Sequence, residues 1–477
     1  MKHFYQKGIA IVLSGLLIAS LAACGGNTDN TDPTTATATI DEATRPAATS
    51  TSNATEATVK KLSEADITIN ETIENNADSE HAILADGNTA SYSNTKVVKT
   101  GDSDSGDEAD FYGDNAAIFA TNGATLDLSE MVVKSDGTHA NAVFSYGEGT
   151  IVNISDSYIE TSGNCSGGLM TTGGGTMNAT NLTITTSGNS SAAIRSDRGG
   201  GTVNVDGGSY TTSGTGSPVI YSTADITVSN AEMTSTASQG VVVEGKNSVT
   251  LNNVTLNADN NKKNSDKSSY YQAVMIYQSM SGDAAQGTSS FTMNGGTLNN
   301  QNGDIFFVNN TATDITLNNS TIVNNDTDGV FLRAAAAGWG SEGSNGGQVN
   351  LNATNQEING DMIVDDISVL NLYLNDKSSF FGSINSSGNA GDVYVELSGD
   401  SEWILTADSY VTSLTCDASS IDLNGHKLYV NGVEYQEGTA STGSAIEFTV
   451  SSSGGHGGDT PPDGGHGSGG TPPAKPD

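Results

Sequence analysis

The feature that most constrains the fold is a repeat of about 25 residues. Short apolar runs recur along the chain, and their central residues lie 25 or 26 positions apart at Ile118, Val143, Leu169, Ile194 and Ile220. The series continues with irregular gaps at Val242, Met275, Phe306 and Phe331. A repeat of this length indicates a solenoid, in which each repeat is too small to fold alone and buries its apolar residues against its neighbours.

Each repeat contains two further apolar segments. The second segment has two apolar residues separated by one polar residue, as in Leu126 and Leu128, Val152 and Ile154, Val203 and Val205, Ile226 and Val228, and Ile315 and Leu317. The third segment is marked by Val132, Ile159, Ile184, Tyr210, Met233, Val254, Leu298 and Ile322. Alternation of apolar and polar residues is typical of a β-strand with one buried face, so the repeat predicts three strands per turn of the chain.

A column of turn residues gives an independent indication of the fold. Residues that tolerate a positive φ stand between the second and third strands of seven repeats, at Asp156, Asn181, Gly207, Asn230, Asn253, Gly295 and Asn319. In a solenoid every repeat makes the same corner, whereas a propeller or a sandwich requires no such column. We therefore predict an all-β protein: a single-stranded right-handed parallel β-helix with three strands and about 25 residues per rung.

Composition sets the predicted domain limits. Residues 24–60 and 451–477 contain few large apolar residues, which predicts a disordered stalk and a disordered tail rich in Gly, Pro and His. Between them we expect an N-terminal cap with the first rungs over 61–115, regular rungs over 116–361, and final rungs with a C-terminal cap over 362–450. Three polar insertions, at 259–272, 281–290 and 334–347, lengthen the regular part.

The first 23 residues resemble the signal peptide of a bacterial lipoprotein. Lys2 and Lys7 precede an apolar run over 9–21 that is short for a membrane span, and a Leu-Ala-Ala-Cys motif follows at 21–24. The resemblance implies that Cys24 is lipidated after residues 1–23 are removed. It predicts an extracytoplasmic protein that this lipid tethers to the cell membrane or outer membrane and that is exposed at the cell surface.

The charge of the chain excludes one class of partner. There are 55 acidic and 18 basic residues, for a formal net charge of −37, and such a surface repels the phosphates of nucleic acids and anionic lipids. Cations and neutral glycans are more compatible ligands, and membrane contact is expected through the Cys24 lipid only. Cys165 and Cys416 are expected to be buried thiols, and a disulfide between them is left open.

Segments 197–203, 275–283 and 402–410 resemble those of bacterial adhesin-like or autotransporter-passenger-like β-helix proteins. They read Asp-Arg-Gly-Gly-Gly-Thr-Val, Met-Ile-Tyr-Gln-Ser-Met-Ser-Gly-Asp and Glu-Trp-Ile-Leu-Thr-Ala-Asp-Ser-Tyr. The likeness covers residues from about 80 to 435 and implies a pectate-lyase-like solenoid at the cell surface. This group has no settled ligand, so no catalytic residue is transferred from it.

Unusual side chains concentrate after the first strand of the repeats and in the insertions. The candidate ligand-binding residues are Arg195, Asp197, Arg198, Tyr221, Glu244, Lys246, Tyr270, Tyr271, Tyr277, Gln278, Arg333 and Trp339. Aromatic rings stack on sugar rings, and arginine, aspartate and glutamine hydrogen-bond to hydroxyls or carboxylates, so this set predicts a carbohydrate groove. The alternative is a surface ion-pair ladder between adjacent rungs, which needs no ligand.

We expect a surface adhesion or binding protein that recognises a polysaccharide or a host or bacterial surface glycan. One alternative is a polysaccharide lyase-like enzyme, which would use a base such as Arg195 or Lys246 with calcium held by carboxylates. The sequence lacks the close carboxylate cluster that such an enzyme requires. Another alternative is a structural cell-envelope protein with no small ligand.

An acidic segment ahead of the regular rungs is a candidate calcium site, and calcium is the one cofactor considered. Asp102, Asp104, Asp107 and Asp110 resemble the opening of a calcium loop, but the twelfth position of such a loop is Gly113 here instead of glutamate. The alternative for these four carboxylates is solvated surface charge.

Overall fold

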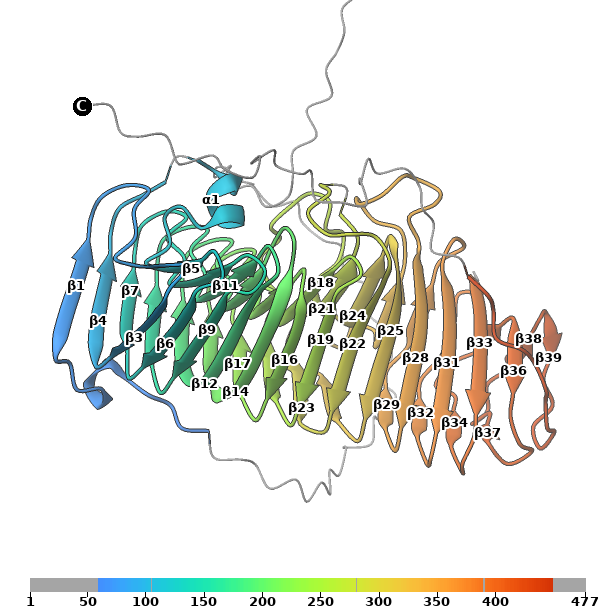
Figure 1. The fold of residues 1–477 in the computed structure, drawn as a ribbon. Coiled ribbons are helices and arrows are strands. Elements are labelled where there is room, and N and C mark those ends of the chain that lie inside the picture. Colours follow the sequence, from blue (N-terminus) through green and yellow to red (C-terminus); the bar gives the residue numbers. More distant parts are fainter. Residues whose placement is uncertain (1–58, 104, 280, 389–390, 449–477) are drawn as a thin grey trace, which may run out of the picture.

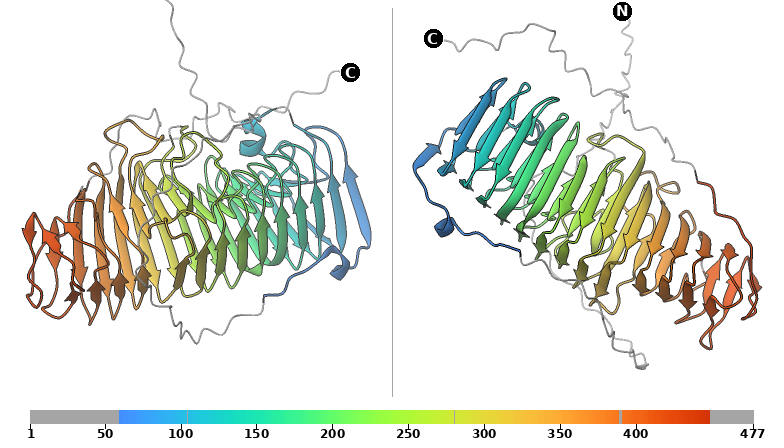
Figure 2. Two further views of the ribbon diagram at one scale, coloured as in Figure 1. Left: turned by 180° about the vertical axis from the view of Figure 1, so that it is seen from behind. Right: turned by 60° about the horizontal axis from the view of Figure 1, so that its bottom comes forward.

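The computed structural model describes residues 59–103, 105–279, 281–388 and 391–448. Over these residues the chain winds into one elongated coil whose strands lie side by side along its length (Figure 1, Figure 2). Strand pairing is parallel almost throughout, so the predicted parallel β-helix is confirmed. The predicted signal peptide, Cys24, the stalk up to residue 58 and residues 449–477 lie outside the described part of the chain.

The strands stack on three faces of the coil, which we name faces 1, 2 and 3. Face 1 is an 11-stranded parallel sheet of β2 (Ile83–Asp86), β5 (Ile118–Thr121), β8 (Val143–Tyr146), β11 (Leu169–Thr172), β13 (Ile194–Ser196), β15 (Ile220–Ser222), β18 (Val241–Glu244), β21 (Gln272–Tyr277), β24 (Asp304–Asn309), β27 (Leu332–Ala334) and β30 (Met362–Val364). Face 2 contains β3 (Thr89–Ser93), β6 (Thr125–Ser129), β9 (Ile151–Ser155), β12 (Gly175–Thr186), β14 (Gly201–Thr212), β16 (Asp225–Ser229), β19 (Ser248–Asn252), β22 (Thr288–Asn294), β25 (Thr311–Asn318), β28 (Gly347–Thr354), β31 (Val369–Asn375), β33 (Asp392–Leu397) and β36 (Ser413–Thr415).

Face 3 follows the corner after face 2, and the long strands β12 and β14 span this corner. It contains β1 (Glu71–Asn75), β4 (Thr95–Lys99), β7 (Val132–Ser135), β10 (Tyr158–Thr161), β17 (Glu232–Ser235), β20 (Thr255–Ala258), β23 (Thr297–Asn300), β26 (Thr321–Asn324), β29 (Glu357–Asn359), β32 (Ser379–Phe381), β34 (Glu402–Ile404) and β37 (Ile421–Asp422). The last sheet consists of β35 (Ser409–Val411), β38 (Leu428–Val430) and β39 (Val433–Glu434). The described helices are the 3-10 turn η1 (Glu64–Asp66) and α1 (Asp107–Tyr112), and no helix in this part of the chain is long and apolar enough to cross a membrane.

The interior of the coil is filled by side chains that point inward from the three faces. As the repeat predicted, the inward column of face 1 contains Ile118, Val143, Leu169, Ile194 and Ile220, all completely buried. Further along, the prediction was shifted by one residue at three of its four positions, and the column continues with Val241, Val274, Phe306 and Leu332. Because successive strand residues point to opposite sides of a sheet, Val242 and Met275 point outward.

The predicted column of turn residues is confirmed at the corner between faces 2 and 3. All seven residues have a positive φ: Asp156 46°, Asn181 52°, Gly207 75°, Asn230 55°, Asn253 53°, Gly295 62° and Asn319 49°. Asparagine side chains also link neighbouring rungs at this corner, since Asn253 Nδ2 donates to Asn230 Oδ1 at 3.2 Å. The same corner therefore repeats along the coil for a local conformational reason.

The two cysteines of the coil are both buried. Cys416 is a free thiol, so the disulfide between Cys165 and Cys416 that the sequence left open is not formed.

Candidate functional site

The outward residues of face 1 form a second aligned column, which we name the outer ladder. It runs through Phe119, Phe144, Met170, Arg195, Tyr221, Val242, Met275, Phe307 and Arg333. The sequence places Arg195, Tyr221 and Arg333 at the corner after the first strand, but they lie within strands β13, β15 and β27. This column makes the outside of face 1 largely apolar, and such a surface is stable in water only under a cover.

Four segments supply this cover. Helix α1 precedes β5, residues 259–271 connect β20 to β21, residues 278–287 connect β21 to β22, and residues 335–346 connect β27 to β28. In Figure 1, α1 and these connections rise on the same side of the coil. Two of them also touch each other, since Gly338 N donates to Lys267 O at 3.1 Å. The three long connections match the predicted insertions to within a few residues.

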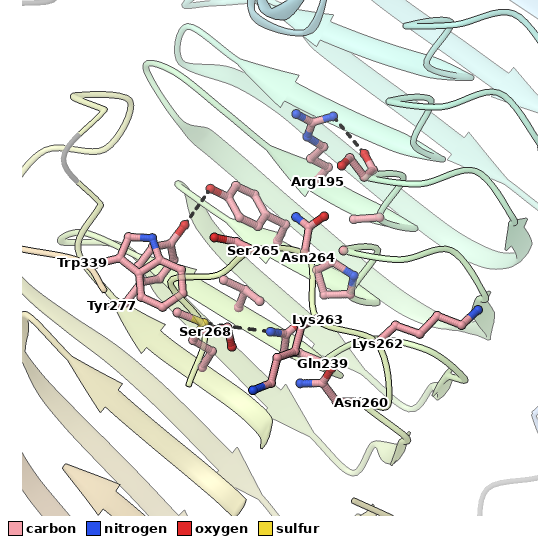
Figure 3. A pocket seen from close by; sticks show the side chains of 17 residues that line it. Arg195, Gln239, Asn260, Lys262, Lys263, Asn264, Ser265, Ser268, Tyr277 and Trp339 are labelled. Atoms are coloured by element: carbon pink, nitrogen blue, oxygen red, sulfur yellow. Dashed lines mark hydrogen bonds between the residues drawn. The ribbon is translucent and has the colours of Figure 1, made fainter. Parts of the chain in front are cut away.

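A cavity lies between the outer ladder and the segments 259–271 and 335–346 (Figure 3). Its empty volume is about 800 Å³, including the part open to solvent. Its apolar and aromatic lining is Ala192, Gly216, Pro218, Tyr221, Val242, Met275, Tyr277 and Trp339. Its polar and basic lining is Ser190, Arg195, Gln239, Asn260, Lys262, Lys263, Asn264, Ser265 and Ser268. Among these described residues there is no Asp or Glu.

Tyr277 and Trp339 form the aromatic wall of the cavity. Their rings meet edge to face with centroids 5.2 Å apart, and each residue is 5% exposed. Asn345 holds the backbone beside the indole, because its Nδ2 donates to Trp339 O at 2.8 Å. Trp339 Nε1 is buried and donates no hydrogen bond to a described residue. A buried donor of this kind favours an acceptor from a ligand or a water.

The opposite wall is the segment 259–271. Asn260 fixes its start, since Nδ2 donates to Gln272 O at 3.1 Å. Lys263 Nζ donates to Ser269 O at 3.2 Å. The wall packs closely on the corner before β15, where a Cβ added at Gly216 would lie 2.4 Å from the Asn264 side chain. Gly216 also has a φ of +64°, so its position favours glycine for two reasons.

A buried polar network behind the cavity connects face 1 with α1. The Arg195 guanidinium lies 3.2 Å from Asp110 and 2.9 Å from Asp197, and Asp110 lies 3.3 Å from His139. Burial raises the pKa of Asp197 to about 7, because it disfavours the carboxylate more than Arg195 favours it. Burial also opposes the charge of Arg195, but Asp110 and Asp197 outweigh it and raise its pKa. These groups are buried, so they form neither a surface ion-pair ladder nor an open groove.

Glu244 positions the two phenols that line the cavity. Tyr221 donates to Glu244 Oε2, and Tyr277 donates to the same oxygen at 2.9 Å. Burial raises the pKa of Glu244 and the pKa values of both tyrosines. The phenols therefore remain protonated, and the shared carboxylate fixes the direction of their hydroxyls.

Arg198 joins two of the covering segments. Its Nη2 lies 2.7 Å from Asp283 Oδ1 in the connection 278–287, and its guanidinium carbon lies 3.9 Å from the ring centroid of Phe111 in α1. Arg198 is not among the lining residues of the cavity. Arg198 therefore supports the cover, and its partner Asp283 was not predicted from the sequence.

Besides Arg198, five candidate residues lie neither in the lining nor in the buried groups behind it. Arg333 forms an ion pair with Asp304 at 2.6 Å, and its guanidinium carbon lies 4.2 Å from the ring centroid of Tyr270. Gln278 is buried and donates to Ser279 O and Ala284 O. Tyr271 lies beneath the Lys263 ammonium, and Lys246 is exposed. The structure thus brings Arg195, Tyr221, Tyr277 and Trp339 together and leaves these five outside.

The carboxylates of the acidic segment have different partners. Asp102 Oδ1 accepts a hydrogen bond from Thr138 N at 2.7 Å, whereas Asp110 lies on α1 and is paired with Arg195. Solvated charge is therefore the wrong interpretation for Asp110, which is completely buried. Asp104 and the side chain of Asp107 lie outside the described residues.

One group of donor atoms lies close enough together to share a metal ion, and it is a different set from the predicted one. Donor atoms of Asp110, His139 and Cys165 lie within 4.8 Å of one another. Asp110 is already paired there with the cation of Arg195. We therefore assign no metal to this group.

Most of the polar lining of the cavity was not predicted from the sequence. Gln239, Asn260, Asn264, Ser265 and Ser268 are of residue types that occur throughout the chain. The one available signal was the length of the insertion at 259–272, which identified the segment but not the side chains that face inward.

Comparison with models of known families, with curated proteins and with solved structures finds no match for this chain. The chemistry of the cavity is therefore inferred from its own side chains. Aromatic and apolar groups form one wall, and amide, hydroxyl and ammonium groups form the other, an arrangement that suits a small ring-shaped ligand with many hydroxyls.

Proposed function

We propose that the protein is a cell-surface binding or adhesion protein for carbohydrate, tethered through a lipid on Cys24, and that the cavity beside Trp339 holds the sugar. The observation that carries the proposal is the presence in one cavity of an aromatic wall and a facing wall of amides and hydroxyls. Aromatic rings pack on the apolar faces of sugars, and amides and hydroxyls pair with sugar hydroxyls.

Binding is better supported than catalysis. Glycoside hydrolysis commonly requires two carboxyl groups beside the scissile bond, and none of the described lining residues is Asp or Glu. The nearby carboxylates of Asp197 and Glu244 are occupied by Arg195 and by the two phenols. They support the walls of the cavity from behind.

A glycan array with the purified full-length chain tests the proposal. We expect binding to a restricted set of glycans and its loss in Trp339→Ala. Tyr429→Ala is the matched control, because it also removes an aromatic side chain but from a stacked pair with Tyr410 at the C-terminal end of the coil.

Two results would contradict the proposal. Unchanged glycan binding by Trp339→Ala would place the sugar elsewhere on the protein. No binding to any glycan by the natural chain would favour the structural cell-envelope role.

A further inference from the structure

The charged side chains that line the cavity are basic, whereas the chain as a whole is acidic. The chain as a whole has 55 acidic and 18 basic residues. The lining of the cavity includes Arg195, Lys262 and Lys263 and, within the described residues, no carboxylate. The side chains that line the cavity therefore favour an anion more than the acidic chain as a whole does.

The three cations differ in their availability. Arg195 is neutralised by Asp110 and Asp197. Lys262 and Lys263 are exposed at the rim and form no ion pair with a described residue. In Figure 3, the Lys262 side chain extends away from Tyr277 and Trp339. Neither ammonium group is paired with a described carboxylate, although Lys263 Nζ also donates to Ser269 O at 3.2 Å, so both can still pair with an anionic group of a ligand.

The aromatic wall contains a further hydrogen-bond donor, the indole N–H of Trp339. Trp339 Nε1 is buried without a hydrogen-bond acceptor among the described residues, and Trp339 is 5% exposed. One wall of the cavity thus contains a buried N–H with no described acceptor, and the other contains two ammonium groups that are not paired with a described carboxylate. The ammonium, amide and hydroxyl donors of the lining favour a ligand rich in acceptor oxygens.

We infer that the ligand is a glycan whose terminal sugar carries a carboxylate. The inference rests on the proposed function and specifies the ligand of the same cavity. The sugar ring packs against Trp339 and Met275, and its carboxylate pairs with Lys262 and Lys263 at the rim. The acidic sugar stands at the end of the glycan, because the segment 259–271 closes one side of the cavity and a net charge of −37 repels a long polyanion laid along the coil.

Tryptophan fluorescence can report on this cavity selectively. The chain has two tryptophans, and the second, Trp403, is completely buried in the core. In a full-length Trp403→Phe protein, Trp339 is the remaining tryptophan, and the ligand is expected to change its emission. The titrants are two matched pairs: sialyllactose against lactose, and trigalacturonate against galactotriose.

The expected result is that at least one acidic sugar binds about tenfold or more tightly than its neutral counterpart, as charge-assisted hydrogen bonds require. The double substitution Lys262→Gln, Lys263→Gln is expected to abolish this preference, measured as the ratio of the affinities for the acidic and the neutral sugar in the same protein. Lys267→Gln is the matched control, because it removes the same charge from the same segment at a residue outside the lining. It is expected to retain the preference.

The outcomes separate this inference from the proposed function. Equal binding of acidic and neutral sugars, or a preference that survives in the double variant, overturns the carboxylate inference and leaves carbohydrate binding intact. Binding of sulfated glycans without binding of either carboxylated titrant also overturns it. Failure of every glycan to bind overturns both proposals.

Discussion

Among the individual residues, Asp197 shows most directly how burial changes chemistry. It is 1% exposed, and burial raises its pKa from an ordinary value of 3.8 to about 7 even though Arg195 lies 2.9 Å away. A folded-state pKa above the unfolded value means that folding takes up a proton between these two pH values. The contribution of Asp197 to stability is therefore fully present below pH 3.8 and is lost as the pH rises through about 7.

The substitution Asp197→Asn removes this titration and keeps an oxygen that can accept from Arg195. We expect the free energy of unfolding of the variant, relative to that of the natural chain, to rise by about 2 kcal/mol between pH 5 and pH 7. Urea unfolding of both proteins at the two pH values measures the difference. A difference that does not change with pH would mean that Asp197 is already ionised at pH 5.

Residue types alone identified Arg195, Asp197 and Glu244 as unusual. They did not indicate that these side chains are buried. Asp110 comes from a segment far earlier in the chain, and it approaches Arg195 only because α1 folds back over face 1. No local pattern encodes such a long-range contact. The sequence could therefore indicate the side of the coil that carries the site, but not which of its residues face a cavity.

At the scale of the structural elements, the corner between faces 2 and 3 was predictable because its requirement is local. Each rung needs one residue with a positive φ there, and Asn, Asp and Gly meet this requirement at low cost. The register of face 1 was less predictable. Val241, Val242 and Val243 are all apolar and buried, because the outer side of this strand is covered as well as the inner side. Apolar and polar residues do not alternate in such a strand. The sequence therefore does not show which of two neighbouring residues points inward.

The corner gives a test at this scale in Asn253, which has a φ of 53°. Asn253→Val and Asn253→Gly both remove the hydrogen bond to Asn230, but only valine is strained in the left-handed conformation. We expect valine to lower the free energy of unfolding by about 1–2 kcal/mol more than glycine does. Urea unfolding of the two variants side by side measures this, and equal destabilisation would show that the backbone conformation carries no cost.

The cover of face 1 gives a second test, at Arg198. Its guanidinium lies between the Phe111 ring in α1 and the Asp283 carboxylate in the connection 278–287. We expect Arg198→Ala to increase the amide hydrogen exchange of α1 and of residues 281–287 by about tenfold, since one charge-assisted contact is lost on each side. Exchange in β12 and β14 should not change. Lys246→Ala is the control, because it removes an exposed cation from the same side. If α1 remains protected from exchange in both variants, Arg198 does not hold the cover.

At the scale of the whole molecule, a stack of parallel strands has two ends at which backbone groups are unpaired. At the C-terminal end, β38 pairs with β35 in parallel, and β39 then pairs with β38 in the antiparallel direction. The chain continues back over the last rungs, where Ser441 pairs with Cys416 and Ile446 N donates to Asn371 at 2.9 Å. The hairpin and this returning segment cover the edge on which a further rung of another molecule could stack.

Deleting residues 428–477 removes this cover and uncovers the edges of β35 and β36. We expect the shortened protein to self-associate with rising concentration, because its unpaired strand edges accept a second coil in the same parallel register. Deleting residues 449–477 removes only the chain beyond the described cap, so this variant is the matched control and should keep the oligomeric state of the full chain. Light scattering across a concentration series distinguishes the two. If both variants associate, residues 449–477 provide the protection. If neither associates, the last rung resists stacking even without its hairpin.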